Sequence, residues 1–395
     1  MTRITIIILC CLLSAVLPAH AQKKELNQAQ THIKSGKEKD LQTAEKLLTG
    51  LLEKSENRQN IKIYLTLYEA VRKQYEAANE KLYLRQKYDT AHFFSLIRRM
   101  HLIAESIDSL DVKHKYRERH SEQMNQLRRN LYAGGAWHVK KNLFDHAYSY
   151  FDTYLDAARQ PLFQSYDYQR NDTLMAQSAY WATYCAHKLQ RPDSVLCYCE
   201  MALADESKAD FTLQYMCEAY RQLGDTAAYV KTLHDGFNLF PSNTYFFPRL
   251  SDYYTAQKDY QTVLQLTNFG LEKQNDNQMF LLAQSIAQLN LEQYEDCLVT
   301  SERLIALNDN MPEPYFNVAT VKLNQALELE KKNQPRLYRK QLIELYYDAR
   351  PYMEAYRKLA PNDQRHWAPA LYRIYLNLNM GKQFEEIDRL MKKMK

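Results

Sequence analysis

The sequence predicts an all-α protein built from stacked pairs of antiparallel helices. The main observation is a fixed period of about 34 residues, because three consecutive rows that begin at Asp210, Thr244 and Gln278 align without a gap. Each row has the apolar spacing of one helix, a short turn and a second helix. The composition agrees with this prediction, since the 395-residue chain is 46% hydrophobic and 25% charged and has only eight glycines. Such a chain is expected to be folded rather than disordered.

The positions within each row, numbered here as columns, indicate how the two helices pack. Column four is large and apolar, column eight is small, and columns twenty, twenty-four and twenty-seven give the second helix an apolar or small face. Row by row, these columns contain Leu213, Cys217, Tyr229, Leu233 and Gly236, then Phe247, Ser251, Val263, Thr267 and Gly270, then Leu281, Ser285, Cys297, Ser301 and Leu304. One helix pair cannot bury such a face alone, so neighbouring pairs bury it for each other.

The turn between the two helices of a row falls at columns fifteen and sixteen. These columns contain Gly224-Asp225, Lys258-Asp259 and Glu292-Gln293. The whole pattern resembles the tetratricopeptide repeat. The resemblance implies a right-handed superhelical solenoid of antiparallel helix hairpins, and it implies nothing about which partner is bound. The alternative, an ordinary helical bundle with accidental spacing, is disfavoured by three rows in register.

Residues 1–21 have the features of an export signal. Arg3 supplies a positive charge, residues 4–17 are apolar, and residues 19–21 form a small-x-small cleavage pattern. The mature chain is therefore expected to begin at Gln22 and to lie in the periplasm or outside the cell. Residues 81–94 are also similar to stretches in secreted repeat proteins of gut bacteria.

Two other interpretations of this segment are disfavoured. A membrane anchor would need roughly 18 apolar residues, and the apolar run is shorter and ends at Pro18. A lipid attached to Cys10 or Cys11 would cut the apolar region short. No other segment has the length and hydrophobicity of a membrane span, so we expect none in the mature chain.

The remaining chain is expected to form one continuous domain, because no Pro-rich or Ser/Gly-rich linker divides it. We assign 1–21 to the export signal, 22–127 to degenerate N-terminal helical repeats, 128–309 to tetratricopeptide-like repeats, and 310–395 to an extended hairpin and a C-terminal capping repeat. A cap with a polar outer face is what a solenoid needs at its end.

Two further rows begin at Arg128 and Ala176, separated by an insertion at 160–171. Gly134 and Gly135 fall inside a predicted helix, where each glycine costs roughly 1 kcal/mol relative to alanine. We expect them to be tolerated because a neighbouring helix packs closely against them.

The sequence contains no motif that indicates catalysis. It has no Gly-x-Ser-x-Gly, no phosphate-binding glycine-rich loop and no His-Glu-x-x-His. We therefore predict a non-catalytic protein without a cofactor. The alternatives left open are a helical domain of an enzyme that acts on envelope glycans or peptides, and a purely structural subunit of an envelope complex.

The mature chain would contain five cysteines, and three of them occupy small core columns, where a thiol acts as a small hydrophobic group. A disulfide between Cys199 and Cys217 is the alternative. A metal site would use Cys197 and Cys199 with Cys185 and His187, but side chains two residues apart point in different directions on a helix. We therefore predict no metal site.

Charge is uneven along the chain. Residues 58–141 contain 17 Lys and Arg against 9 Asp and Glu, whereas the whole chain has a net charge of +5. This basic N-terminal half is either an ordinary solvated surface or a surface that meets anionic lipid, an acidic protein or a polyanionic glycan of the envelope. Nucleic acid is disfavoured by the export signal.

The resemblance places columns two, five, nine and twelve on a concave groove lined by first helices. In four rows these columns contain Gln177, Tyr180, Tyr184, His187, Phe211, Gln214, Glu218, Arg221, Tyr245, Pro248, Asp252, Thr255, Met279, Leu282, Ile286 and Leu289. Aromatic rings among a few polar groups suit a peptide or a partner helix. The predicted contacts are Tyr180, Tyr184, His187, Phe211, Glu218, Arg221, Tyr245 and Asp252. The other interpretation is that the aromatic residues only pack against neighbouring repeats.

Overall fold

The structure is a computed structural model that describes residues 22–332 and 334–394. Over these residues the chain is helical and contains no strand, as predicted. It separates into two compact units, one that ends at Tyr229 and one that starts at Val230. The division falls inside a helix, α11 (Thr226–Leu239), where no linker composition marks it, and the predicted domain organisation stays a prediction.

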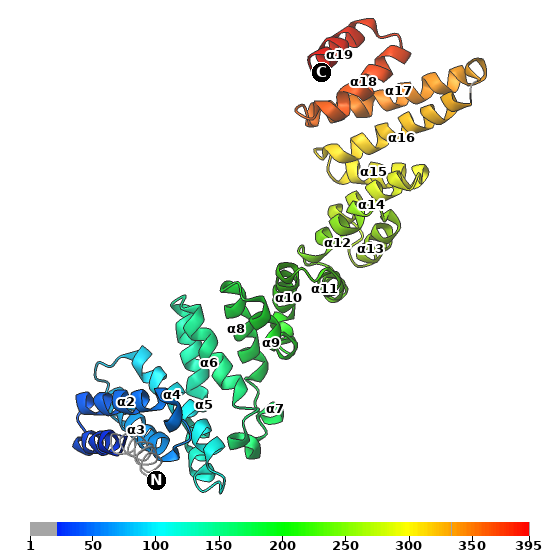
Figure 1. The fold of residues 1–395 in the computed structure, drawn as a ribbon. Coiled ribbons are helices and arrows are strands. Elements are labelled where there is room, and N and C mark those ends of the chain that lie inside the picture. Colours follow the sequence, from blue (N-terminus) through cyan, green and yellow to red (C-terminus); the bar gives the residue numbers. More distant parts are fainter. Residues whose placement is uncertain (1–21, 333, 395) are drawn as a thin grey trace, which may run out of the picture. The chain divides into compact units, whose positions relative to one another are not determined.

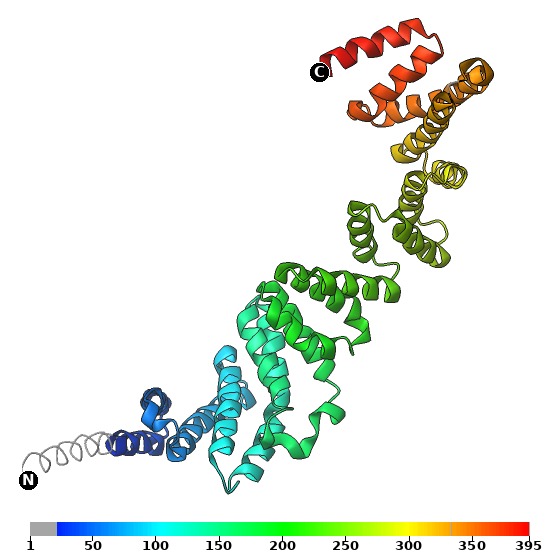
Figure 2. The same ribbon diagram turned by 45° about the vertical axis from the view of Figure 1, so that its right-hand side comes forward.

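Both units consist of helices that follow one another in space in the order of the sequence (Figures 1 and 2). In the first unit a helix at 22–35 is followed by α2 (Glu38–Glu53), η1 (Ser55–Asn57), α3 (Ile61–Tyr83), α4 (Thr90–Leu110), α5 (Arg117–Lys140), α6 (Phe144–Asp156), η2 (Pro161–Tyr166), α7 (Tyr168–Asn171), α8 (Met175–Lys188), α9 (Pro192–Ala202), η3 (Glu206–Lys208) and α10 (Ala209–Leu223). The proposed boundary at 128 lies inside α5, so it does not separate structural elements.

The second unit continues the alternation of first and second helices after α11. It contains α12 (Phe246–Ala256), α13 (Tyr260–Lys273), α14 (Gln278–Asn290), α15 (Tyr294–Leu307), α16 (Pro312–Lys331), α17 (Pro335–Leu359), α18 (Gln364–Asn377) and α19 (Gly381–Met394). No helix of the described residues combines the length and hydrophobicity needed to cross a membrane. The predicted export signal at 1–21 lies outside the described residues and stays a prediction.

A left-handed turn closes the first helix of most pairs. One residue has φ between +53° and +74°, and the N–H of the next residue donates to the carbonyl five positions earlier at 2.8–3.0 Å, the bond that defines a Schellman turn. The left-handed residues are Arg85, Asn142, Gln190, Gly224, Lys258, Glu292 and Asn379. Four of them, from Gln190 to Glu292, recur once per row at column fifteen, so the predicted period is confirmed in the backbone.

Small residues allow the helices to approach closely, as the sequence predicted. A Cβ atom on Gly135 would lie 2.7 Å from the ring of Phe151, in the second helix of the same pair. Gly134 is confined less tightly, because its Cβ would lie 3.1 Å from Phe94 and Tyr150. At column twenty-seven, a Cβ on Gly270 would lie 2.8 Å from Phe280, which belongs to the next pair. Glycines thus serve contacts both within and between pairs.

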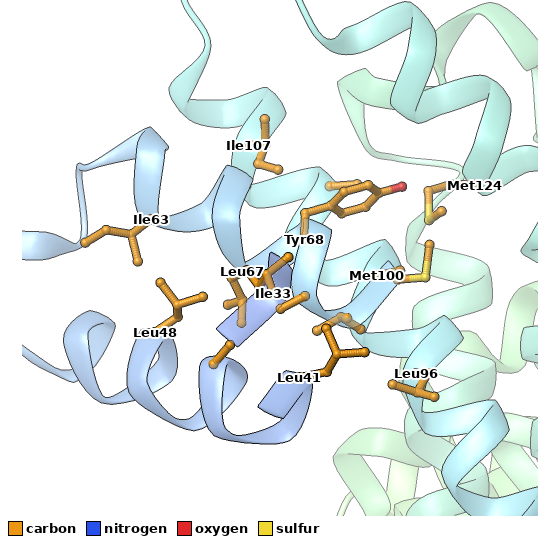
Figure 3. Close-up of a cluster of buried hydrophobic side chains, with 14 of the residues drawn as sticks. Ile33, Leu41, Leu48, Ile63, Leu67, Tyr68, Leu96, Met100, Ile107 and Met124 are labelled. Carbon is orange, nitrogen blue, oxygen red and sulfur yellow. The ribbon is translucent and has the colours of Figure 1, made fainter. Parts of the chain in front are cut away.

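The N-terminal helices share one apolar core (Figure 3). Leu48 of α2, Ile63 of α3 and Met100 of α4 are fully buried there. Tyr68 also lies in this core, and its hydroxyl donates to Gln123 Oε1 on α5 at 2.9 Å. The degenerate repeats predicted for this region are therefore well-packed helix pairs, although their sequences depart from the regular row pattern.

The insertion at 160–171 is tied to α5 by a buried arginine. The guanidinium of Arg128 lies 3.8 Å from the centre of the Tyr154 ring and 3.7 Å from that of Tyr168, and it forms an ion pair with Asp172. It also donates to the Tyr154 carbonyl at 3.0 Å. Burial acts to raise the pKa of Asp172, but hydrogen bonds from Tyr154 and Arg128 outweigh it and hold that pKa below its ordinary value. Arg128 is only 4% exposed, so these partners replace the water that would otherwise solvate its guanidinium.

We predict that Lys258→Gly stabilises the protein by about 0.5–1 kcal/mol, because a left-handed backbone is strained for any residue with a Cβ. Lys258 is exposed, and the substitution removes no buried contact. Gln265→Gly, at an exposed position in the interior of α13, is the matched control and should destabilise by about 1 kcal/mol. Urea unfolding followed by circular dichroism measures both, and equal destabilisation by the two changes would contradict the turn geometry.

We also predict that Arg128→Ala destabilises the protein by about 3–5 kcal/mol, because it leaves the Asp172 carboxylate without its buried cation. Arg128→Lys should recover little of this loss, since an ammonium cannot stack between two rings and hydrogen-bond as a planar guanidinium does. Arg129→Ala, an exposed neighbour on α5, should change stability by less than about 0.5 kcal/mol. Thermal unfolding of the three variants tests the role of the buried cation, and similar losses at both positions would refute it.

Candidate functional site

A groove with a volume of about 280 Å³ opens between α12, α13 and α14 in the second unit. Its lining contains Phe247, Pro248, Ser251, Asp252, Thr255, Tyr260, Val263, Met279, Leu282, Ala283, Ile286 and Ala287. Most of these side chains are apolar, and the groove is therefore suited to an apolar side chain of a ligand.

The groove brings together the columns that the sequence analysis assigned to a concave surface. Two first helices contribute six such positions, namely Pro248, Asp252, Thr255, Met279, Leu282 and Ile286. Successive first helices of the repeat lie side by side, so equivalent columns from two rows meet in space. Of the eight predicted contact residues, Asp252 is the one that lines this groove, and its role in binding stays a prediction.

Asp252 is the acidic residue of the groove lining. Its carboxylate is exposed, and within the described residues it has no ion-pair partner at 4.0 Å or less. Small side chains deepen the groove beside it, because Ser251 on α12 and Ala283 and Ala287 on α14 leave space between the helices. Tyr260 and Val263 of α13 contribute the remaining wall. The site therefore offers one negative charge at the edge of an apolar hollow.

In the first unit the equivalent columns form a packed aromatic cluster. Tyr180 is only 7% exposed, and its ring centre lies 6.5 Å from that of Tyr184 and 6.3 Å from that of Tyr215. His187 stacks on Tyr215 with the ring centres 4.5 Å apart. Burial lowers the pKa of His187, which disfavours its charged form. Tyr180 therefore packs against neighbouring residues, as the second interpretation of the groove columns expected. Tyr184 and His187 remain partly exposed.

Two members of this cluster were not predicted from the sequence. Trp181 packs edge-on against Tyr184 at 5.6 Å between ring centres, and Tyr215 contacts three predicted residues. Trp181 and Tyr215 each follow a predicted groove column by one residue. Successive residues of a helix are rotated by about 100°, so the column rule assigned these two residues to a different face of the helix. The density of aromatic residues at 180, 181, 184 and 215 was the available signal.

The other predicted contacts are dispersed. Phe211 is 43% exposed on α10. Arg221 donates two hydrogen bonds to Glu218 Oε2 on the same helix, at 2.6 and 3.0 Å, so its guanidinium already pairs with a carboxylate of the protein. Tyr245 belongs to the second unit, where the guanidinium of Arg249 lies 3.6 Å from its ring centre. The assignment of Tyr184, Arg221 and Tyr245 as ligand contacts stays a prediction.

No disulfide joins the five described cysteines, so the alternative of a disulfide between Cys199 and Cys217 was wrong. Four are buried, as expected for small core residues, and Cys197 is exposed. Burial raises the pKa of Cys185 to about 12 and that of Cys199 and Cys297 to about 11. Over 22–332 and 334–394, no group of three or more His, Cys, Asp or Glu is arranged to hold a metal ion.

The structure is similar to several solved repeat proteins. The C-terminal part of a TPR repeat-containing protein from Cytophaga hutchinsonii aligns at 12% identity over 64% of this chain and 91% of its own, with a TM-score of 0.41. Yeast Tom70 aligns at 13% identity over 95% and 91% of the two chains, with a TM-score of 0.34. The TPR2AB domain of yeast Sti1, solved in complex with pHSP90, aligns at 14% identity over 82% and 97%, with a TM-score of 0.27.

Antiparallel helix pairs and a left-handed turn that recurs every 34 residues give the described residues a tetratricopeptide-repeat fold. The predicted fold class is thereby confirmed, and the backbone turn that recurs once per row is its most direct sign. No model of a known protein family matches the chain, and no curated protein matches it.

We predict that one of the five described thiols reacts rapidly with 5,5′-dithiobis(2-nitrobenzoic acid) in the native protein. Exposed Cys197 is that thiol, because the buried thiols are shielded and those with a raised pKa form little thiolate at neutral pH. Cys197→Ser should abolish the fast phase, whereas Cys199→Ser should leave its amplitude unchanged. A fast phase of two or more thiols from the described chain would contradict the burial of the other four.

Proposed function

We propose that this protein is a non-catalytic scaffold that binds a segment of another protein through the groove between α12, α13 and α14. The observation that carries the proposal is the groove itself, which combines an apolar hollow with the exposed carboxylate of Asp252. An aspartate on an open surface is well solvated, but at the edge of a hollow it fixes the orientation of a bound cation.

The groove suits a peptide that presents an apolar side chain close to a basic residue. The apolar side chain would lie against Met279, Leu282 and Ile286, and the basic group would pair with Asp252. A helical segment presents such a pair at a spacing of three or four residues, because these positions share one face. A volume of about 280 Å³ limits the groove to one or two side chains, so further contacts would come from the surrounding first helices.

We further propose that the protein works in the cell envelope, in the periplasm or at the cell surface. This part of the proposal rests on the sequence of residues 1–21, whose charged start, apolar run and cleavage pattern are typical of an export signal. Amino-terminal sequencing of the protein isolated from its native envelope tests it. A chain that starts at Gln22 would support export, and a chain that starts at Met1 would contradict it.

Screening a displayed peptide library against the purified protein should enrich peptides with an apolar residue three or four positions from Lys or Arg. Asp252→Asn should weaken binding of these peptides by about 1–2 kcal/mol, or roughly 5- to 30-fold, because it removes a charge-assisted hydrogen bond. Ala283→Phe should abolish binding, because the larger side chain fills the hollow between α12 and α14. Fluorescence polarisation with the enriched peptides gives both values.

The matched control is Asp348→Asn, which removes an exposed carboxylate on α17, away from the groove lining. It should change the affinity by less than about twofold. Circular dichroism establishes that each variant is folded. If Asp252→Asn and Asp348→Asn have the same effect, or if the enriched peptides lack basic residues, the groove is not the binding site.

A further inference from the structure

The hairpin formed by α16 and α17 is longer than the other pairs of the second unit. α16 has 20 residues and α17 has 25, whereas α14 and α15 have 13 and 14. Six or more additional residues per helix correspond to roughly 9 Å or more of added length. Figure 1 shows the far end of this hairpin reaching past α15 and α18, and the residues that flank the turn there, Lys331, Lys332 and Arg336, are exposed.

The tip carries a dense positive charge. Between residues 331 and 340 the sequence contains five Lys or Arg and no Asp or Glu. We define the hairpin tip by its exposed residues Lys331, Lys332, Arg336, Leu337, Arg339 and Lys340. Among its cations, Lys340 lies 3.9 Å from Glu344, and both side chains are mostly exposed, so this contact neutralises little of the charge.

The carboxylates next to the tip are engaged elsewhere. Glu330 accepts hydrogen bonds from Tyr346 at 2.6 Å and from Arg373 at 2.5 Å. Glu328 interacts with Tyr294 of α15. Within the described residues, no carboxylate lies within 4.0 Å of Lys331, Arg336 or Arg339. The positive charge of the tip is therefore available to an external anion.

The basic N-terminal half differs in this respect. Arg72, Lys81, Arg99, Arg117 and Arg128 each form an ion pair with a carboxylate of the first unit. Part of the positive excess between residues 58 and 141 is thus neutralised inside the fold, which the linear sequence does not reveal. The hairpin tip instead concentrates unneutralised cations in one short stretch.

A large apolar side chain lies among these cations. Leu337 is 68% exposed, whereas Leu233 and Leu281 of the repeat core are at most 1% exposed. Cations that surround an exposed leucine on a projecting surface are complementary to a membrane interface, where phosphates lie above the acyl chains. A flat lipid surface also requires no matching pocket, and a projecting tip reaches it without collision.

We propose that the hairpin tip docks on the anionic lipids of a membrane surface. The five cations lie at the phosphate level, and Leu337 enters the boundary between headgroups and acyl chains. Each Lys or Arg near an anionic surface strengthens binding roughly fivefold at moderate ionic strength. The attraction acts within about 10 Å and weakens as salt screens it. The interaction is separate from the groove and holds the protein at the membrane whether or not the groove is occupied.

Sedimentation of the purified protein with vesicles tests this proposal. Vesicles of phosphatidylcholine with about one third phosphatidylglycerol should bind at least tenfold more strongly than phosphatidylcholine alone. Lys331→Glu, Lys332→Glu, Arg336→Glu and Arg339→Glu in combination should reduce this binding at least 30-fold. Leu337→Ser should reduce it several-fold, and this smaller effect should persist at high salt, where the charge contribution is lost.

The matched control replaces four exposed lysines of the first unit by glutamate, namely Lys87, Lys113, Lys115 and Lys140. Its net charge therefore changes by the same amount as that of the variant with four substitutions at the hairpin tip. It should reduce vesicle binding less than threefold. Equal losses in the two variants would indicate attraction by net charge and overturn the proposal. Equal binding to neutral and anionic vesicles would also overturn it. Soluble polyglutamate is a second probe, and binding to it without binding to anionic vesicles would overturn the proposal and identify an acidic protein as the partner. Thermal unfolding confirms that both variants are folded.

Discussion

The reversal of the chain after each first helix is the constraint on which the rest of the structure depends. One residue adopts a left-handed backbone, and the following N–H returns to the carbonyl five positions earlier. Because so few residues make this turn, the second helix is held against the first, and only a small residue fits at the crossing. Gly135 against Phe151 is the tightest example within a pair. The stacking of pairs, and the groove between first helices, follow from this geometry.

The sequence predicted the repeated part of the fold because side-chain size and polarity repeat there with a fixed period. The buried column-four residues Leu213, Phe247 and Leu281 illustrate this. It gave little indication of the left-handed turns, since six of the seven residues that adopt them are not glycine and have no common side chain. It also could not locate the division inside α11, because a boundary between compact units depends on contacts between distant residues, and the helix itself continues.

Side-chain volume explains why the predicted groove columns form a packed aromatic cluster in the first unit and an open groove in the second. The same columns contain Tyr180 and Tyr184 in α8, where large rings fill the space and contact each other. In α12 and α14 they contain Asp252, Thr255 and Ile286 beside small residues, and a hollow remains. Column position was therefore predictable from the period. Whether a column contributes to an open surface depends on its neighbours in adjacent helices, which a single row of the sequence does not specify.

Whether a charged residue contributes to the surface charge also depends on its neighbours in adjacent helices. A count along the sequence drew attention to residues 58–141, yet Arg117 and Arg128 of that region are held by Asp108 and Asp172. Ion pairs between helices are set by the fold, and they remove charge from the surface without changing the count. The end of α16 and the start of α17 extend beyond the neighbouring, shorter helices. No carboxylate of those helices therefore neutralises Arg336 or Arg339. Length beyond the repeat thus converts an ordinary basic sequence into an exposed positive surface.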